Sequence, residues 1–484
     1  MSTLPLAIAL PLAGAFALRP LARVSKPVAS WLGPLLLTAV VAILLGAAAG
    51  AGGTTMVVAL GGFAAPLGIA LVGDALALVF ALAVPLLSLL FWPWADTADV
   101  RERSLWLLLA AAGAGMALAG DLFTLYVFYE LAAVASFGLA AVNDNARSEI
   151  AALRYLLLSA LGSLVALVGI ALVYNAAGTL NLAHLAQRAP TVLHDARGLA
   201  AFACLLVGFG VKAEVFPVNS WVPEVYATAP ARVSALLAGL VSKLALLVIV
   251  RLLLLVFTQP EAALLLLAVG VLGLASGELA AWHARDFPRM LAGSSIAQLG
   301  LVCVAFSISG AAGVLAGVIA ALHHLVVKSA LFDLSREWSG ALDQLAGVAR
   351  RSPLAGALFV LFALSLVGLP PLPGFWAKLF VLRGLMDAGS TVALVAAFVL
   401  LAVTVVEANY LFRLILAMYR ADPPQAATPG RFRAFPAALL GGVLLVGTVA
   451  AAPIGERLGR LAQQAADRGG YIANVLGHQS RGRL

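Results

Sequence analysis

Residues 211–251 read VKAEVFPVNSWVPEVYATAPARVSALLAGLVSKLALLVIVR, and this stretch decides how the rest of the chain is interpreted. It contains Lys212 and Lys243, each inside an apolar run long enough to cross a lipid bilayer. A lysine in hydrocarbon costs at least about 2.5 kcal/mol on insertion scales. A chain that places several lysines there needs them to face water or an acid. The stretch therefore predicts an ionisable path inside a membrane protein.

The composition of the whole chain supports this interpretation. Its 484 residues are 63% hydrophobic and 11% charged, whereas a soluble domain is about 25% charged. With about 20 apolar residues in each membrane helix, the chain has room for roughly fourteen spans. No alternating ten-residue pattern occurs in the sequence, which argues against a β-barrel. The composition therefore predicts an all-α, polytopic membrane protein.

We expect the spans near residues 4–20, 31–50, 68–93, 104–119, 121–142, 150–175, 199–218, 231–257, 261–282, 291–309, 311–333, 353–385, 390–419 and 434–453. The twelfth span is too long for one straight crossing and contains Pro370, Pro371 and Pro373. Proline removes a backbone donor and clashes with the preceding turn, so this span and the seventh, at Pro217, should be broken. Two broken helices at corresponding places in two halves are a sequence indication of a transport site.

The loop arginines predict the orientation of the spans. They concentrate in the loops after odd-numbered spans, Arg431 and Arg433 among them, which places those loops in the cytoplasm and the N-terminus outside. The C-terminal tail is also basic, with Arg457 and Arg460, although an even span count would put it outside. Either the span count is off by one, or the tail docks on a partner.

Ten ionisable side chains inside the predicted spans are candidates for a proton relay, because an intramembrane charge is a functional candidate by default. The first group comprises Glu130, Lys212, Lys243, His324, Lys328 and Lys378. The second group, in which relay and structural roles are both open, comprises Glu214, Glu278, His323 and Glu407.

Glu130 lies in the middle of a span and would be the acidic partner that lets Lys212 keep or release its charge. The alternatives are a structural hydrogen bond for Glu130 and snorkelling of the lysine to an interface. Glu214 is two residues from Lys212, roughly 200° around a regular helix, so the two do not face each other. Glu214 is then a second proton site or a partner for another subunit.

His324 and Lys328 are four residues apart, and therefore lie on one helix face. A histidine titrates near pH 6.5 and suits a proton relay. His323 lies on a different face of this helix, and its role is either in the relay or in packing. Lys378 follows the break in the twelfth span, and Glu407 in the next span is its expected exchange partner.

Several polar residues have structural interpretations. Asp74, at the start of the third span, is expected to be an interfacial or structural acid. The arginines near span ends should snorkel to the membrane surface; they are Arg251, Arg383 and Arg413. Cys204 and Cys303 sit in apolar runs and are expected to pack without a disulfide. We expect no metal site and no bound cofactor, because neither ligand spacing nor a phosphate-binding motif occurs in the sequence.

The motifs taken in order resemble the antiporter-like membrane subunits shared by respiratory complex I, Mrp-type cation/proton antiporters and membrane-bound hydrogenases. The resemblance covers roughly residues 74–420 and depends on the joint order of six blocks: VFYELAAVASF, KAEVFPVNSWVPEVYATAP, SALLAGLVSKL, RDFPRMLAGSSIAQLG, HHLVVKSALF and PLPGFWAKLFVLRG. It implies about fourteen transmembrane helices, two inverted five-helix repeats (spans 4–8 and 9–13) and relay roles for the first group of residues. The chain departs from the family pattern at Glu214, Asn219 and Glu407.

The resemblance implies four segments. They are residues 1–103 with the first three helices, 104–257 and 258–420 with the two repeats, and 421–484 with the last helix and the basic tail. The implied function is that of a proton-translocating subunit in the bacterial inner membrane. Its expected partners are other membrane subunits, including related antiporter-like ones, together with the lipid bilayer, protons and Na⁺. We expect no nucleic acid partner.

Two alternatives share the same residues. The chain could belong to an Mrp-type Na⁺/H⁺ antiporter that has no redox module, or it could be a scaffold that has lost transport. The presence of all six first-group residues argues against a scaffold, since loss of transport would free those sites to become apolar. The chain has no redox or hydrolytic motif of its own, so whether its complex is an oxidoreductase depends on its partners.

Overall fold

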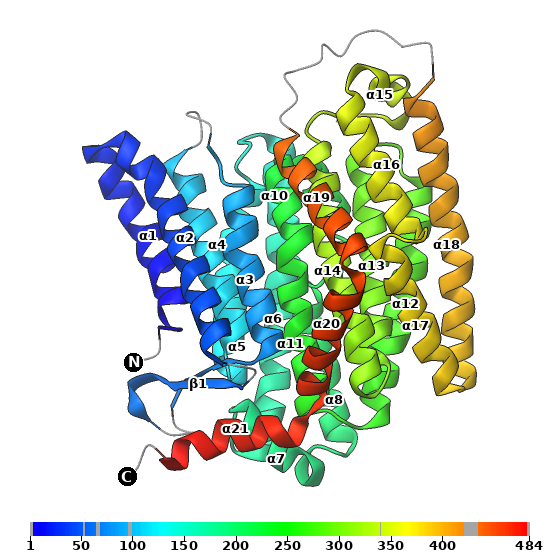
Figure 1. Ribbon diagram of the computed structural model, residues 1–484. Helices are drawn as coiled ribbons and strands as arrows, with labels where there is room; N and C mark the ends of the chain where they lie inside the picture. The colour runs from blue at the N-terminus through cyan, green and yellow to red at the C-terminus, as the bar shows by residue number, and fades with distance from the viewer. Residues whose placement is uncertain are drawn as a thin grey trace. The chain divides into compact units, whose positions relative to one another are not determined.

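The computed structural model describes residues 3–51, 54–63, 68–94, 99–338, 340–420 and 434–481. Most of these residues are helical, as Figure 1 shows. A helix satisfies its own backbone hydrogen bonds, which is what an apolar surrounding without water requires. Arg431 and Arg433, which contributed to the predicted orientation, lie outside the described residues.

In chain order the elements are α1 (Leu6–Val24), α2 (Lys26–Ala51), β1 (Met56–Ala59), η1 (Leu60–Gly62), β2 (Ala70–Gly73), α3 (Ala75–Leu90), α4 (Val100–Leu118), α5 (Leu122–Ala140), α6 (Ala146–Ala177), α7 (Leu182–Val192), α8 (Ala196–Gly210), α9 (Val222–Thr228), α10 (Ala231–Leu236), η2 (Leu237–Val241), α11 (Ser242–Leu255), α12 (Pro260–His283), α13 (Phe287–Ser307), α14 (Gly310–Leu334), η3 (Leu342–Leu345), α15 (Val348–Arg351), α16 (Pro353–Val367), α17 (Pro373–Ala388), α18 (Thr391–Met418), α19 (Phe435–Val449), α20 (Ala451–Ala466) and α21 (Arg468–Arg481).

Short polar side chains determine where many of these helices begin. Asp74 accepts a hydrogen bond from the Ala77 amide at 2.7 Å, and Asp121 caps α5 in the same way through Thr124. Asn181 caps α7. Such caps satisfy amide groups that the first turn of a helix leaves unpaired. They fix the ends of helices whose apolar interiors contain no other start signal.

Packing divides the chain into two compact units. The first unit contains Met1–Ala213, Leu240–Ala262 and Gln463–Leu484. In it α4 packs against α1 and α5, while α8 packs against α6 and α11. Close approach of α6 and α8 requires small residues, since a Cβ on Gly208 would lie 2.5 Å from the Ala166 Cβ and 2.7 Å from the Gly162 carbonyl oxygen.

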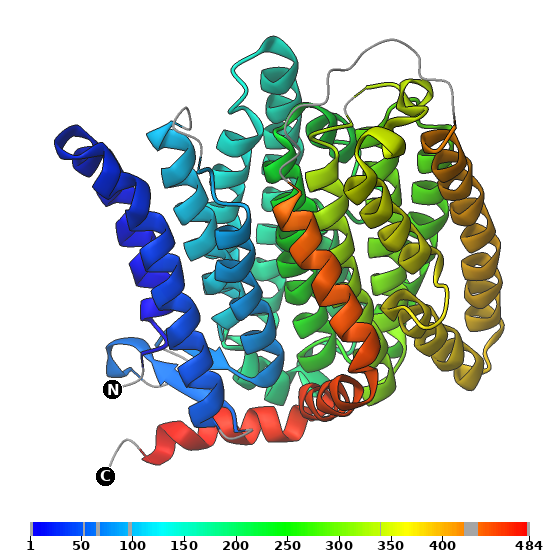
Figure 2. The same cartoon turned by 45° about the horizontal axis from the view of Figure 1, so that its top comes forward.

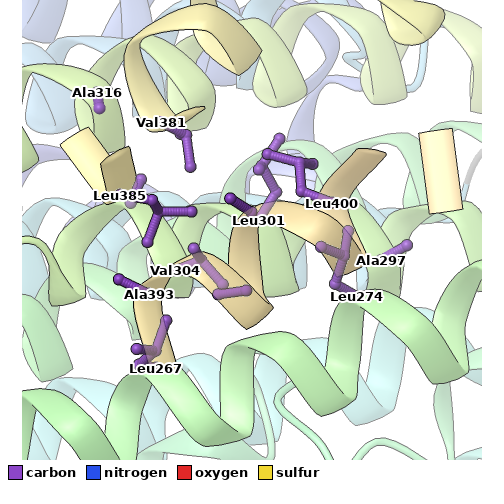
Figure 3. Close-up of a cluster of buried hydrophobic side chains, with 13 residues drawn as sticks. Leu267, Leu274, Ala297, Leu301, Val304, Ala316, Val381, Leu385, Ala393 and Leu400 are labelled. Atoms are coloured by element: carbon purple, nitrogen blue, oxygen red, sulfur yellow. The ribbon is translucent and has the colours of Figure 1, made fainter. Parts of the chain in front are cut away.

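The second unit contains Glu214–Gly239 and Ala263–Ala462. In it α14 packs against α10, α13, α17 and α19. Figure 3 shows part of its apolar core, where side chains of α12, α13, α17 and α18 meet around Leu301 and Val381. This core holds together the helices that carry the polar side chains described below.

Both predicted helix breaks are present. The α8 helix ends at Gly210, and regular helix resumes only at Val222, beyond Pro217. The α16 helix ends at Val367, and Gly368 follows with a φ of 89°, a left-handed conformation that glycine adopts without strain. The proline-rich stretch then leads into α17. Proline and glycine therefore interrupt these helices where the sequence predicted.

The mostly helical fold also contains one element that the all-α prediction did not include. Strands β1 and β2 form an antiparallel hairpin in which Met56 pairs with Gly73 and Ala59 with Ala70. The third span was predicted to begin at residue 68, but residues 70–73 are extended and α3 begins only after the Asp74 cap. Apolar length alone could not separate a short strand from the start of a helix.

The tail also forms structure that was not predicted. The α20 and α19 helices meet at an angle of 88°, a bend visible in Figure 2. The α21 helix packs against α7 within the first unit, and Arg468 donates a hydrogen bond to the Ala186 carbonyl. The basic tail therefore docks on its own chain.

Within the described residues, nine helices are long and apolar enough to cross a membrane, or ten if α19 and α20 count as one bent span. Three shorter apolar helices, α3, α8 and α16, add to these. The count of fourteen, the inverted repeats and the four-segment division remain predictions.

Arg251 corrects another expectation. It does not snorkel to a surface but is only 3% exposed, and its Nη2 lies 2.8 Å from the Asp74 Oδ1. A buried charge requires an opposite charge nearby, which Asp74 supplies from a position 177 residues away. Arg413 and Arg383 are exposed, and Arg383 lies 3.7 Å from Asp387.

The packing of α6 on α8 gives a stability prediction. Gly208→Ala should lower the free energy of unfolding by about 1–3 kcal/mol, because the new methyl group overpacks a contact between two backbones. Gly442→Ala, on α19 with nothing within 4 Å of its Cβ position, is the matched control and should be neutral or slightly stabilising. Thermal unfolding of both variants in detergent is the measurement. Equal shifts would contradict the tight α6–α8 contact.

Candidate functional site

The lysines are distributed unusually in this chain. The sequence has five lysines, and four of them are at most 9% exposed. The buried four are Lys212, Lys243, Lys328 and Lys378. Only Lys26 is exposed. Lysine is among the residues that are almost never fully buried unless paired, so each of these side chains needs an explanation in its surroundings.

Lys212 follows the end of α8 in the first unit. Its Nζ donates a hydrogen bond of 2.7 Å to the Ser159 Oγ and lies 3.6 Å from the centre of the Tyr129 ring. The Tyr129 hydroxyl in turn donates to the Gly208 carbonyl at 2.8 Å, which holds the ring in place. A hydroxyl and an aromatic face together stabilise a cation without a direct ion pair.

Glu130, on α5, accepts a hydrogen bond from the Ser163 hydroxyl. Ser159 and Ser163 are four residues apart and share one face of α6. The predicted partners Glu130 and Lys212 are thus both held by this serine pair, each with its own hydroxyl partner, and their charges are close enough to interact. The arrangement places an acid and an amine one helical turn apart along α6.

Lys243 lies in the first turn of α11 and is 1% exposed. Its Nζ donates to the neighbouring Ser242 Oγ at 3.1 Å. The preceding turn, Leu237–Val241, is a π-helix, which the sequence did not predict. Single π-helical turns inside α-helices are found frequently at functional sites.

Glu214 is in the irregular segment after Lys212 and belongs to the second unit. Its φ of 57° takes it out of any regular helix, so the predicted 200° separation does not apply. Its carboxylate accepts hydrogen bonds from the Tyr226 hydroxyl at 2.5 Å and the Ser295 hydroxyl at 2.9 Å. The Ser295 Oγ also lies 3.4 Å from the His324 Nε2. Glu214 and His324 therefore share one serine.

Lys328 is fully buried, which rules out snorkelling within the described structure. Its Nζ donates a 2.5 Å hydrogen bond to the Ser294 Oγ on α13. Gln298, four residues after Ser294 on the same face, donates to the Glu407 Oε1 at 2.9 Å. One face of α13 thus contacts both the lysine of α14 and the acid of α18.

Lys378 and Glu407 form the expected pair, with their Nζ and Oε2 atoms 2.6 Å apart. The Lys378 Nζ also donates to Thr404 and to the Val367 carbonyl, each at 3.2 Å. Val367 is the last residue of α16, and a helix end leaves carbonyl groups unpaired. The break in the twelfth predicted span therefore supplies an acceptor to the lysine.

Glu278 and His323 also have polar partners. The Tyr410 hydroxyl donates to the Glu278 Oε2 at 2.9 Å. The His323 Nε2 lies 2.9 Å from the Ser365 Oγ, which also accepts from the Gly374 amide at 3.4 Å across the second break. All four members of the second group are thus hydrogen-bonded to other helices or segments.

Sequence reasoning missed the hydroxyl and amide side chains that connect these residues. They are Tyr129, Ser159, Ser163, Tyr226, Ser294, Ser295, Gln298 and Tyr410. A signal was available, since Ser159 and Ser163, and likewise Ser294 and Gln298, recur at a spacing of four inside apolar runs. Two polar residues on one face of an otherwise apolar helix indicate a buried polar contact.

The chemistry that these groups can perform includes holding and moving protons. Amines, carboxylates, an imidazole and hydroxyls all exchange protons over hydrogen-bond distances. Cys204 and Cys303 are free thiols. In the part of the chain that the structure describes, no group of three or more His, Cys, Asp or Glu side chains could hold a metal ion.

Comparison with known proteins gives consistent matches. Residues 119–404 match the family model described as "NADH:quinone oxidoreductase/Mrp antiporter, TM". The NADH-quinone oxidoreductase subunit N of Desulforudis audaxviator is 32% identical over 416 residues, which cover 80% of this chain and 82% of that protein.

Solved structures match over nearly the full length. The membrane-bound sulfane sulfur reductase, an archaeal respiratory membrane complex, contains a chain with a TM-score of 0.91 and 30% identity, covering 98% of this chain and 100% of that one. A chain of the Mrp complex from Dietzia sp. DQ12-45-1b gives a TM-score of 0.87 at 27% identity, with coverages of 98% and 99%.

The Lys378–Glu407 pair gives a second prediction. Glu407→Gln should lower the free energy of unfolding by about 3 kcal/mol, because it leaves a buried lysine without its counter-charge. Asp387→Asn, which removes the acid from the exposed pair with Arg383 on the same helix, should cost less than about 1 kcal/mol. Thermal unfolding of the two variants measures the difference. If both variants unfold at the same temperature, the buried pair does not stabilise the fold.

Proposed function

Because the chain belongs to the NADH:quinone oxidoreductase/Mrp antiporter transmembrane family, we propose that it translocates protons as one subunit of a larger complex in a bacterial inner membrane. The family is one of multi-pass membrane proteins, and the apolar helices of this chain fit that description. The observation that carries the proposal is that four of the five lysines are buried beside proton-exchanging groups.

The choice of lysine supports proton transfer over a purely structural role. Arginine supplies most of the cations in this chain, and it is effectively never deprotonated in proteins. Lysine changes its protonation readily when buried. The chain thus places four of its five lysines, which are able to release a proton, in its interior, where a few arginines such as Arg251 are buried as well.

In the first unit we assign the acid and base roles to Glu130 and Lys212. A proton from Lys212 can pass through its hydrogen-bond partner Ser159, whose hydroxyl accepts it while releasing its own proton, and Glu130 stabilises the charged form of the lysine. When the charge on Glu130 is neutralised, Lys212 loses that stabilisation and releases its proton more easily. Lys243, inside the same unit, is the next proton acceptor in this proposal.

In the second unit we assign the relay to His324, Lys328 and Lys378. Glu214 connects with His324 through Ser295, and Lys378 ends the path at its pair with Glu407. Glu278 and Glu407 both act electrostatically on Lys328, so a proton that leaves one acid changes the charge balance at the lysine. As the sequence predicted, we also propose that a proton passes from Lys243 to His324.

The energy for transport would come from a partner. The relatives include a subunit of an NADH-quinone oxidoreductase and a chain of an Mrp complex, and this chain has no redox motif of its own. The first alternative is that a redox module drives the subunit. The second is that it exchanges protons for Na⁺ in an Mrp-type complex, since a chain of such a complex is also similar to this one.

Isolation of the intact complex through an affinity tag should separate the two alternatives. Partner subunits that contain iron–sulfur or flavin sites would assign the chain to a redox-driven complex, and proton transport should then follow substrate oxidation. A complex that contains only membrane subunits, with proton movement that depends on Na⁺, would assign it to the antiporters. Recovery of the chain without membrane partners would contradict a subunit role.

Lys328→Arg tests the relay itself. The variant keeps a positive charge beside Ser294 but cannot release a proton, so the transport rate should fall at least about tenfold while the complex still assembles. Lys26→Arg, the same change at the exposed lysine, should transport at the normal rate. Proton uptake into vesicles containing the assembled complex is the measurement. Normal pumping by the Lys328→Arg complex would refute the relay.

A further inference from the structure

A small polar chamber lies inside the first unit, away from the lysines described above. It has a volume of about 40 Å³ and lies where the first turn of α3, the end of α11 and the helix α21 meet. Figure 1 shows α21 beside the β1 segment at this end of the unit. Its lining includes Thr55, Asp74, Arg251, Tyr471 and Asn474, all of which carry polar atoms.

Two polar atoms of the lining have no hydrogen-bond partner among the described residues. They are the Arg251 Nε and the Tyr471 Oη, and both are buried. The Arg251 side chain is 3% exposed and uses its Nη2 for Asp74, while Tyr471 is 7% exposed. Buried polar groups in proteins are normally hydrogen-bonded, so two such atoms on one chamber indicate a small polar ligand.

The size and charge of the chamber select water as that ligand. A water needs about 10–15 Å³ of such volume and two to four polar partners, so the chamber has room for about three or four waters. Arg251 and Asp74 already neutralise each other. Asp467, the other acid of the lining, is exposed and accepts a hydrogen bond from the Gly470 amide, so the buried part of the chamber carries no net charge that would bind an ion. Water can accept from the Arg251 N–H and can both donate to and accept from the Tyr471 hydroxyl. Burial raises the pKa of the Tyr471 phenol, which therefore keeps its proton.

The chamber lies near the ends of two helices that carry relay residues. Arg251 follows Lys243 by eight residues on α11, about 12 Å along the axis. Asp121 lies near enough to Tyr471 for its carboxylate to act electrostatically on the phenol. Asp121 caps α5, and Glu130 lies nine residues further along, about 14 Å. Water in the chamber would thus be within a few helical turns of both proton-carrying groups.

We propose that this chamber is a hydrated port through which protons enter or leave the first unit, and that the Tyr471 hydroxyl joins its water to the Asp74–Arg251 pair. The inference rests on the proposed function, because only a proton-translocating chain uses such a port. In this proposal α21 has a functional role in addition to its packing role, because this helix contributes the Tyr471 hydroxyl.

The first test measures water access and does not depend on transport. In a Cys204→Ala/Cys303→Ala background, Leu76→Cys places a thiol in the chamber lining, where the leucine is 3% exposed. Leu107→Cys, at a fully buried position of α4, makes the same change in dry core. Silver ions added to the assembled complex should react at least about tenfold faster with the chamber thiol, because reaction requires a hydrated path. Equal, slow reaction of both thiols would overturn the port.

The second test measures proton transport by the complete complex. Tyr471→Phe keeps the ring but removes the hydroxyl, and should lower the rate severalfold. Val475→Ala, one turn further on the buried face of α21, weakens packing without touching a polar atom and should transport normally. Normal transport by Tyr471→Phe overturns the proposal, and so does an equal loss in Val475→Ala, which would reduce α21 to a packing element. A hydrated chamber in a complex whose Lys328→Arg variant pumps normally would instead count against the proposed function.

Discussion

The free energy of holding a charge away from water constrains the whole structure. A charged amine in an apolar interior is tolerated only beside groups that replace its hydration. Each buried lysine accordingly donates to a side-chain oxygen atom. The partners are Ser159 for Lys212, Ser242 for Lys243, Ser294 for Lys328 and Glu407 for Lys378. The serine-bearing faces of α6 and α13 follow from this requirement, as do the glycine contacts that bring α8 close to α6.

The helix breaks serve the same requirement. An intact helix pairs its own amide and carbonyl groups and offers nothing to a buried cation. The end of α16 leaves the Val367 carbonyl free to accept from Lys378, and the irregular turn after α8 lets Glu214 direct its carboxylate to Tyr226 and Ser295. Proline and glycine therefore disturb the backbone where its polar atoms are needed.

The sequence predicted what depends on local pattern. Apolar runs predicted most helices, prolines predicted both breaks, and the position of each lysine within a run predicted its burial. Contacts between distant segments could not be predicted from the sequence, because the direction of a side chain depends on how its helix packs. Asp74 and Arg251 are 177 residues apart, so no local sequence pattern predicted their ion pair or the chamber beside it. The β1–β2 hairpin was not predicted for another reason, because a four-residue apolar strand has the same composition as the first turn of an apolar helix.

The partners of the buried cations divide them into two kinds. Arg251 is permanently charged and faces a carboxylate, so its pair with Asp74 is a fixed element of the fold. Lys212 and Lys328 each donate to a serine hydroxyl, which accepts from an ammonium and can donate to a neutral amine, so either protonation state keeps a hydrogen bond. Lys378 faces the Glu407 carboxylate at 2.6 Å, so it is ion-paired as Arg251 is. The ion-paired cations are therefore Arg251 and Lys378, whereas Lys212 and Lys328 have the hydroxyl partners that suit the proton transfer proposed above.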